Sequence, residues 1–246
     1  MMYSFLLVGQ SNMAGRGFPA EVEPIPTEGI YVLRNGRWWP MYVPVNPDRV
    51  KSGINLAETF VLRFLQDHPG DTVGIVPCAD GGTCLDQWMP GQVLFDHAVM
   101  MTQLAQRSST LCGILWHQGE SDCYDERYPL YEEKCSHILQ ELRKAVKAPE
   151  VPVLLGGLGE YLEENPNPRY LKYVHVNSAL QAMAAKLPKF GDVASAGLGS
   201  NPDKLHFSAA ALREFGHRYY EAYLRLAPTE LVGKEADLTV TEIEKL

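Results

Sequence analysis

The sequence predicts a three-layer α/β/α fold, in which helices cover both faces of a mostly parallel central sheet. Short apolar runs alternate with amphipathic stretches along the whole chain, which is the pattern of strand–helix–strand units. The apolar runs are continuous rather than alternating, as expected for parallel strands buried on both faces. No repeat, low-complexity segment or linker divides the chain. We therefore expect a single domain over residues 1–228.

The apolar runs are the expected strands, and the first begins close to the N-terminus. Asn35-Gly36 separates two of these runs and is the strongest short signal for a hairpin, so its flanking strands should pair antiparallel. In chain order the expected strands are Tyr3–Val8, Ile30–Arg34, Trp38–Val43, Val73–Pro77, Cys112–Trp116, Val151–Leu155 and Asp192–Ala196.

The amphipathic stretches predict the helices, because their apolar residues recur at helical spacing. Ser208 is a candidate N-cap of the closing helix, and Pro228 lies just beyond its end. Residues 229–246 have no helical face and are expected to form an extended tail. The expected helices are a segment within Leu56–Leu65, then Val93–Ala105, Tyr128–Val146, Leu171–Leu187 and Phe207–Leu224.

Composition indicates a folded globular protein and argues against several classes of function. Of 246 residues, 46% are hydrophobic and 21% are charged, which is ordinary for a soluble domain. The net charge of −8 and the lack of a basic stripe argue against binding to nucleic acid or to anionic membranes. No apolar run approaches the roughly 20 residues that span a bilayer.

The N-terminus and the cysteines predict the compartment. Tyr3–Gly9 is too short for a signal peptide and has no basic flank. The five cysteines are an odd number and form no Cys-x-x-Cys pair, which favours reduced thiols. We therefore expect a cytoplasmic protein, although a leader sequence upstream would instead indicate secretion.

Polar residues follow the first strand, where parallel sheets place their ligand sites. Gly9 followed two residues later by Ser11 resembles half of a nucleophile elbow, although Met13 replaces the second glycine. Ser11 is therefore a candidate nucleophile, and a simple helix N-cap is the alternative. A phosphate loop fits less well because the required glycine and lysine spacing is absent.

Side chains next to Ser11 are candidates for contacts with a substrate. Gln10 and Asn12 flank the serine directly, and Arg16 lies a few residues further on. Arg16 would suit a substrate carboxylate, but a pairing with a nearby acidic residue is equally compatible with the sequence. Trp88 lies beyond the Val73–Pro77 strand and is a candidate for a wall of the pocket.

Two later segments offer donors for a negatively charged oxygen in a transition state. Gly81 and Gly82 follow the Val73–Pro77 strand, and one of their N–H groups could donate to an oxyanion, with an ordinary turn as the alternative. Gln118 follows the Cys112–Trp116 strand, and its side-chain amide is another candidate donor. Glu120, in the same segment, could orient an imidazole or bind a substrate hydroxyl.

Metal binding is not expected at this segment. His117, Glu120 and Cys123 are metal-ligand types, but their spacing fits no single helical face, and no second cluster completes four ligands.

Asp203 and His206 form the last candidate pair. A carboxylate three residues before a histidine can accept the Nδ1 proton and leave Nε2 facing a serine hydroxyl. A serine nucleophile needs such a base, because an isolated hydroxyl is a weak nucleophile near neutral pH. A capping carboxylate beside a surface histidine is the alternative.

Together these segments resemble the sequence blocks of the SGNH-hydrolase superfamily, most closely its carbohydrate esterase family 6 branch, with acetylxylan esterases and sialate O-acetylesterase-like proteins. The matching blocks are Gly9-Gln10-Ser11-Asn12-Met13-Ala14-Gly15, Gly81-Gly82-Thr83, Trp116-His117-Gln118-Gly119-Glu120-Ser121-Asp122 and Asp203-x-x-His206-Phe207. The resemblance implies a flavodoxin-like fold and hydrolysis of acetyl esters on sugars. The reaction that the resemblance implies requires no metal or organic cofactor.

The resemblance also implies roles for these residues. Ser11 would be the nucleophile, His206 the general base and acid, and Asp203 its partner, with Glu120 as the alternative carboxylate. We favour Asp203, because the three-residue spacing places it beside His206. The oxyanion donors would be the backbone N–H groups of Ser11 and of Gly81 or Gly82, with the Gln118 side chain.

The expected activity is a serine esterase that removes acetyl groups from xylo-oligosaccharides or from O-acetyl sialic acid. The alternatives are a lipase or thioesterase with the same residues, and a carbohydrate-binding protein without catalysis. The expected partner is a small acetyl ester or an acetylated oligosaccharide. The sequence does not predict an oligomeric state.

Overall fold

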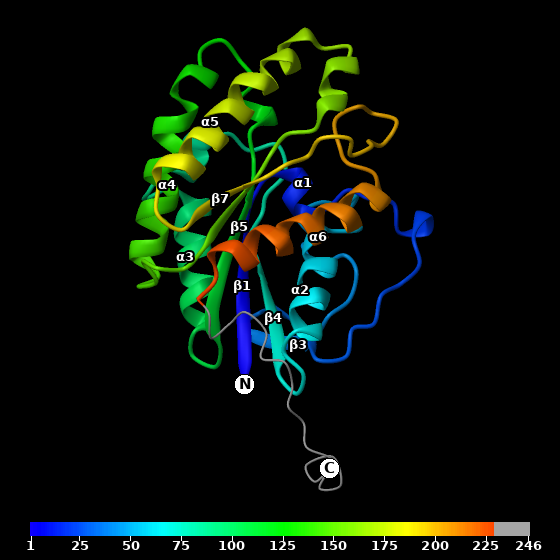
Figure 1. The fold of residues 1–246 in the computed structure, drawn as a ribbon, viewed down its shortest axis with the longest axis vertical. Coiled ribbons are helices and arrows are strands. Elements are labelled where there is room, and N and C mark those ends of the chain that lie inside the picture. Colours follow the sequence, from blue (N-terminus) through cyan, green and yellow to red (C-terminus); the bar gives the residue numbers. More distant parts are fainter. Residues whose placement is uncertain (229–246) are drawn as a thin grey trace, which may run out of the picture.

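A seven-stranded sheet forms the centre of the computed structural model, which describes residues 1–228 (Figure 1). The strand order is β3-β2-β4-β1-β5-β6-β7, and every neighbouring pair is parallel except the β2–β3 hairpin. The strands are β1 (Met2–Gly9), β2 (Ile30–Arg34), β3 (Arg37–Pro40), β4 (Thr72–Pro77), β5 (Thr110–His117), β6 (Val153–Gly156) and β7 (Phe190–Val193).

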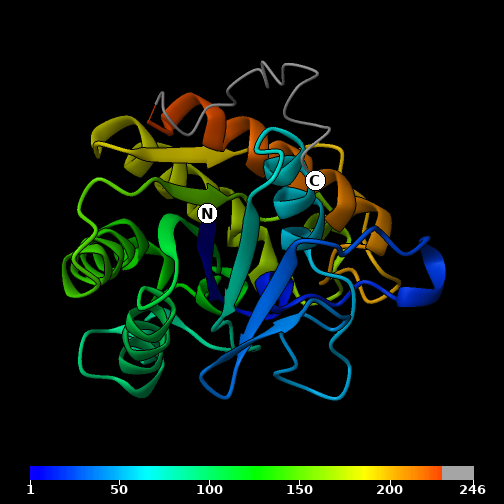
Figure 2. The ribbon, with the colours of Figure 1, turned by 90° about the horizontal axis from the view of Figure 1, so that it is seen from below.

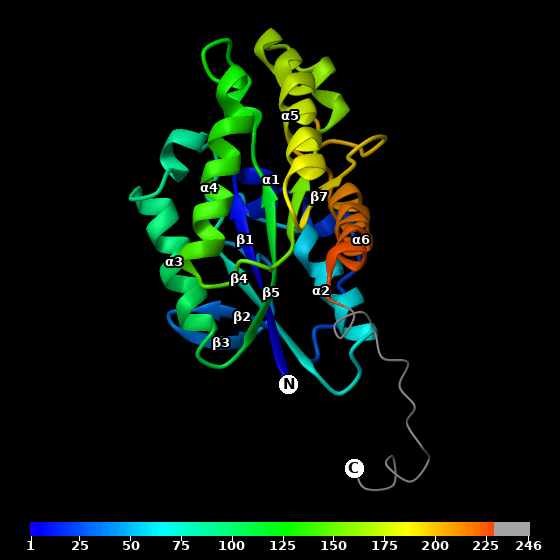
Figure 3. The same ribbon diagram turned by 60° about the vertical axis from the view of Figure 1, so that its left-hand side comes forward.

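Helices cover both faces of this sheet, which confirms the predicted three-layer α/β/α fold. The helices α2 and α6 pack together on one face, whereas α3 and α4 lie on the other, with α5 beside α4 (Figures 2 and 3). The helices are α1 (Ser11–Ala14), α2 (Leu56–Gln66), α3 (Val93–Ala105), α4 (Tyr131–Ala145), α5 (Tyr173–Lys186) and α6 (Ala209–Leu226).

Local sequence explains where these elements start and turn. Asn35 and Gly36 both have positive φ, at 49° and 72°, as the predicted two-residue hairpin turn requires. Asn55 starts α2 with a capping box, in which its side chain accepts the Ala57 N–H and Glu58 accepts the Asn55 N–H. The Ser208 side chain caps α6, as predicted.

Among the predicted strand ends, those of the last strand and of the second hairpin strand differ most from the structure. The last strand is Phe190–Val193 rather than Asp192–Ala196, because the buried Phe190 begins the pairing with β6 opposite Val153. The second hairpin strand ends at Pro40 rather than at Val43. Its partner β2 begins at Ile30, so residues 42 and 43 have no β2 residue to pair with. The tail expected over residues 229–246 lies outside the described residues.

Three helices also begin later than predicted. The stretch from Tyr128 starts as a short 3₁₀ turn, and α4 begins only at Tyr131. A second 3₁₀ turn over Pro168–Lys172 precedes α5. Phe207 lies before the N-cap of α6, where its ring packs against His117 and Tyr161.

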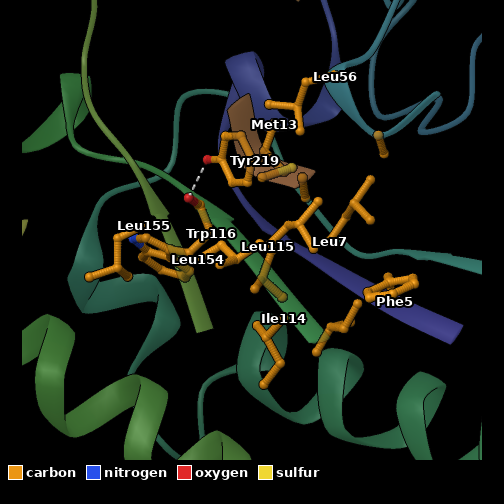
Figure 4. Packing of buried hydrophobic residues seen from close by; sticks show 14 of the residues in the cluster. Phe5, Leu7, Met13, Leu56, Ile114, Leu115, Trp116, Leu154, Leu155 and Tyr219 are labelled. Carbon is orange, nitrogen blue, oxygen red and sulfur yellow. Dashed lines mark hydrogen bonds between the residues drawn. The ribbon is translucent and has the colours of Figure 1, made fainter. Parts of the chain in front are cut away.

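The central strands lie in a tightly packed core. The polar segments that follow them therefore lie at one edge of the sheet, where the parallel strands end. Phe5, Leu7, Ile114 and Leu115 are completely buried where β1 and β5 meet (Figure 4). From α6, the Tyr219 hydroxyl donates to the Trp116 carbonyl over 2.8 Å (Figure 4). Burial of such side chains supplies most of the stability of a domain. The carboxyl end of β1, with α1, lies at the upper edge of the sheet in Figure 1.

Within residues 1–228, no helix combines the length and apolarity that crossing a membrane requires.

Candidate active site

A serine, a histidine and an aspartate form a hydrogen-bonded chain at the carboxyl edge of the sheet. His206 Nε2 lies 3.0 Å from Ser11 Oγ, and His206 Nδ1 lies 2.7 Å from Asp203 Oδ2. The serine comes from the turn after β1, and the other two residues come from the loop before α6. Ser11 and His206 are both buried, so their contact is shielded from bulk water. This arrangement suits proton transfer from a nucleophilic hydroxyl.

The Asp203 carboxylate is fixed by its own loop. One oxygen faces the His206 ring, while the other accepts the backbone N–H groups of Leu205 and His206, each over 3.0 Å. Partial burial alone would raise the pKa of the Asp203 carboxyl, but these hydrogen bonds outweigh it and lower the pKa. Asp203 is therefore ionised at neutral pH and can hold the Nδ1 proton of the imidazole.

The turn that carries Ser11 requires glycine at its first position. Gly9 has a φ of +131°, and a Cβ there would lie 2.0 Å from the His117 carbonyl oxygen. The same carbonyl accepts the Gln10 N–H over 2.9 Å, and the Gly9 carbonyl accepts the Asp80 N–H over 3.0 Å. The β1 turn is thus tied to the ends of both neighbouring strands, and Ser11 follows it directly.

Asn12 connects the serine turn to the histidine loop. Its side-chain oxygen accepts the Phe207 N–H over 3.1 Å, and its amide donates to the Leu205 carbonyl and to Glu120 Oε1. Asn12 thus binds the residues immediately before and after His206, Leu205 and Phe207. Asn12 has no exposed surface, so it is a buried structural link rather than the substrate contact expected for it.

The geometry separates the two candidate carboxylates. Asp203 contacts the His206 ring, whereas Glu120 binds Asn12 and lies 3.8 Å from Nδ1 of His117. Burial lowers the pKa of the His117 imidazole, although Glu120 opposes that shift. Glu120 lines the cleft beside the serine and braces Asn12.

Arg16 pairs with a nearby acid, the second of its two predicted possibilities. Its guanidinium makes two hydrogen bonds to the Asp48 carboxylate, of 2.9 and 2.7 Å, and both side chains are almost fully buried. Asp48 also accepts the Gly81 N–H over 2.8 Å and the Ser52 hydroxyl. Burial would raise the pKa of Asp48, but these donors lower it. The pair therefore fixes the glycine loop beside Ser11.

The predicted oxyanion donors differ in their availability. The Gly81 N–H is committed to Asp48, whereas Gly82 lines the cleft and its N–H has no acceptor among the described residues. Gln118 is fully buried, and its amide donates to Asp122 Oδ2 over 2.5 Å and to the Thr83 carbonyl over 3.1 Å. The expectation that Gln118 presents this amide to the cleft therefore does not agree with the structure.

Trp88 is not a wall of the cleft. Its ring is buried and packs edge to face against Trp116, and its indole N–H donates to Thr83 Oγ1 over 3.0 Å. The residue that was a candidate for substrate contact instead supports the glycine loop from below.

A cleft of about 840 Å³ opens above Ser11 and His206. Sequence reasoning anticipated half of its lining, namely Gln10, Ser11, Arg16, Gly81, Gly82, Glu120 and His206. It missed the rim, which is formed by Arg49, Val50, Lys51, Ser121, Arg169, Tyr170 and Leu205. Most of the rim residues lie in two loops that precede α2 and α5, and no periodic pattern or strand end marks those loops in the sequence.

The metal-ligand types near this cleft do not converge. Within residues 1–228, no group of three His, Cys, Asp or Glu side chains is arranged to hold a metal ion.

Comparison with known proteins identifies the family. Residues 2–225 match the family described as carbohydrate esterase, sialic acid-specific acetylesterase. A probable carbohydrate esterase from Arabidopsis thaliana is 26% identical over 247 residues, which is 89% of each chain. The crystal structure of that plant protein superposes with a TM-score of 0.79 and covers 91% of this chain and 98% of its own.

More distant structures share the fold. NanS is 20% identical with a TM-score of 0.72, covering 91% of this chain and 97% of its own. A carbohydrate acetylesterase from Xanthomonas citri is 19% identical with a TM-score of 0.70, covering 92% of this chain and 56% of its own. The resemblance inferred from the motifs is thus confirmed, and the chain belongs to the carbohydrate esterase family of sialic acid-specific acetylesterases.

Proposed function

We propose that the protein removes O-acetyl groups from carbohydrates through an acetyl intermediate on Ser11. The observation that carries this proposal is the hydrogen-bonded chain from Ser11 through His206 to Asp203 at the floor of the cleft. A binding protein without catalysis would need no buried base aligned on a hydroxyl. The cleft rim carries several cations, whereas a lipase or thioesterase needs a long apolar channel for its acyl chain.

The reaction follows from the roles of these three side chains. Ser11 Oγ attacks the acetyl carbonyl while His206 Nε2 takes its proton, and Asp203 stabilises the resulting imidazolium. His206 then returns the proton to the departing sugar oxygen, which leaves the acetyl group on Ser11. Water, activated by the same imidazole, releases acetate and restores the serine.

Backbone N–H groups stabilise the negative oxygen that forms in both steps. Those of Ser11 and Gly82 have no acceptor among residues 1–228, and both residues line the cleft. The Gly81 N–H supports the site differently, because it holds the glycine loop to Asp48. Donors that are already in place strengthen such sites, since little reorganisation is needed during the reaction.

The charge on the cleft rim favours an anionic sugar. Arg49, Lys51 and Arg169 face this opening in a protein whose net charge is −8. Arg49 is paired with Asp80, but neither Lys51 nor Arg169 forms an ion pair within residues 1–228. Unpaired cations attract a substrate of opposite charge.

Arg169 is held in place by two tyrosine rings. Its guanidinium lies 4.4 Å from the Tyr124 ring and 4.5 Å from the Tyr170 ring, and it donates to the Tyr170 hydroxyl over 2.6 Å. A guanidinium held this way is ready to bind a carboxylate with little loss of entropy. We therefore favour O-acetyl sialic acid, which carries a carboxylate, over neutral xylo-oligosaccharides.

Replacing the nucleophile tests the proposal as a whole. Ser11→Ala should abolish release of acetate from 4-nitrophenyl acetate and from O-acetyl sialic acid, because within residues 1–228 no other hydroxyl contacts the His206 ring. The matched control is Ser121→Ala, which removes another serine of the cleft and should retain most of the activity. Full activity in folded Ser11→Ala would refute the assignment.

Replacing each acid in turn tests which carboxylate supports His206. Asp203→Asn should lower kcat by at least tenfold and up to about 10⁴-fold, because the imidazole loses its Nδ1 acceptor. Glu120→Gln keeps an oxygen for Asn12 and should cost far less. The ionised Asp203 should also lose its contribution to stability only as pH falls through its lowered pKa. A greater loss of kcat in Glu120→Gln would reverse the assignment.

Removing one rim cation tests the preference for anionic sugars. Arg169→Gln should raise KM for O-acetyl sialic acid by roughly tenfold or more, because a charged hydrogen bond is lost. KM for the neutral 4-nitrophenyl acetate should stay unchanged. Arg107→Gln, an exposed site outside the cleft, is the control. Equal effects on the two esters would show that Arg169 does not recognise charge.

A further inference from the structure

We propose that Glu58, in the first turn of α2, is a positioning residue that fixes the distance between Ser11 and His206 through its ion pair with Arg213. The proposal rests on the esterase function proposed above and adds to it a pair of side chains outside the cleft. The two reacting groups need such a link because Ser11 follows β1, whereas His206 lies in the loop before α6.

The N-terminus of α2 is bonded to the turn that carries the nucleophile. The Asn55 side chain caps α2, and its amide donates to the Met13 carbonyl, in the helical turn that begins at Ser11. The adjoining backbone is tied as well, since Gly17 and Ile54 exchange both of their N–H···O=C hydrogen bonds. Asn55 has no exposed surface, so the start of α2 and the serine turn form one buried unit.

The helix that follows the histidine loop packs directly on α2. Gly216 of α6 lies so close to α2 that a Cβ there would be 2.0 Å from Thr59 Oγ1. The Thr59 hydroxyl also donates to the Arg213 carbonyl over 2.7 Å. Because α6 begins at Ala209, three residues after His206, a shift of α6 along α2 would move the imidazole relative to the serine.

Glu58 joins these two contacts in one side chain. One carboxylate oxygen accepts the Asn55 N–H over 2.8 Å, and the other lies 2.8 Å from Nη1 of Arg213 on α6. Glu58 is completely buried, and the Arg213 side chain is mostly buried. Burial raises the pKa of the Glu58 carboxyl, although Arg213 and the Asn55 N–H oppose that shift. The carboxylate therefore connects the cap that holds the serine turn with the helix that follows the histidine loop.

The helix cap alone does not explain the charge on Glu58. Glutamine at this third helical position completes a capping box as well, because the cap needs only a side-chain oxygen. A buried ion pair is also a poor source of stability, since apolar residues of similar volume often stabilise a protein as much or more. What the Glu58–Arg213 pair supplies is direction, because its short contact is kept only at one separation of α2 and α6.

The spacing matters because His206 takes the serine proton across a single hydrogen bond of 3.0 Å. A misplacement of about 1 Å can lower the rate of a reaction about a hundredfold. Without the ion pair the two helices would still pack, but the hydroxyl and the imidazole would spend less time in contact. Proton transfer would slow, whereas binding of the ester would stay the same.

A double variant separates this positioning role from a contribution to stability. Glu58→Gln combined with Arg213→Leu removes both charges, keeps an oxygen for the Asn55 N–H and leaves no buried charge unpaired. It should fold with a Tm close to that of the wild type. Its kcat for 4-nitrophenyl acetate should fall by roughly tenfold or more, with KM unchanged. Inactivation by phenylmethanesulfonyl fluoride should slow by the same factor, because that rate reports the reactivity of Ser11 itself.

Glu214→Gln is the matched control, because it breaks another glutamate–arginine pair of α6, with Arg218, at the surface. It should leave both rates unchanged. The proposal is overturned if the folded double variant keeps either its kcat or its inactivation rate close to the wild-type value. If the double variant does not fold, Glu58→Gln alone, measured below its Tm, decides by the same two rates. Neither result would affect the esterase function, which is tested by Ser11→Ala.

Discussion

The turn at Gly9, where β1 leaves the sheet, is the constraint on which the rest of the site depends. Its positive φ and its contact with the His117 carbonyl leave no room for a side chain. Because the turn bonds to the last residue of β5 and to the segment after β4, it holds together three strand ends that are distant in sequence. Ser11 is positioned because it follows this turn directly. The Asn12 side chain then binds the loop that carries His206.

Two buried networks complete the site from opposite sides. On one side, the Arg16–Asp48 pair holds the glycine loop by accepting the Gly81 N–H. On the other, Asp122 and Gln118 brace the cleft from beneath. Breaking one partner of a buried charged pair is costly, so the Arg16–Asp48 pair fixes geometry as well as charge. The catalytic chain therefore lies between rigid supports, whereas the rim above it is formed by loops.

The fold and the catalytic chain could be predicted because their signals are local. Continuous apolar runs identify buried parallel strands, and a carboxylate three residues before a histidine can reach its ring without knowledge of the rest of the chain. The triad assignment remains a proposal, but its geometry agrees with that spacing. The ends of β3 and β7 were not predictable, because they depend on where the partner strand begins or which residue anchors the core.

Other features needed three-dimensional contacts. The sequence does not show that the Gln118 amide is directed at Asp122 and at the Thr83 carbonyl. Trp88 and Asn12 lie beside predicted site residues in the sequence, yet their side chains are buried beneath the site. Arg169 lies in a loop of no regular pattern, and its position over two tyrosine rings depends on the packing of a different segment.

Partitioning of the acetyl group between water and added hydroxylamine tests the central claim, an acetyl intermediate on Ser11, most directly. The ratio of acetate to acetohydroxamate should be the same for 4-nitrophenyl acetate, phenyl acetate and an O-acetyl sugar. A shared acetyl-enzyme has already lost the leaving group when water or hydroxylamine attacks it, so the ratio cannot depend on that group. A ratio that changes with the leaving group would mean direct attack of water on the ester, and would contradict the account.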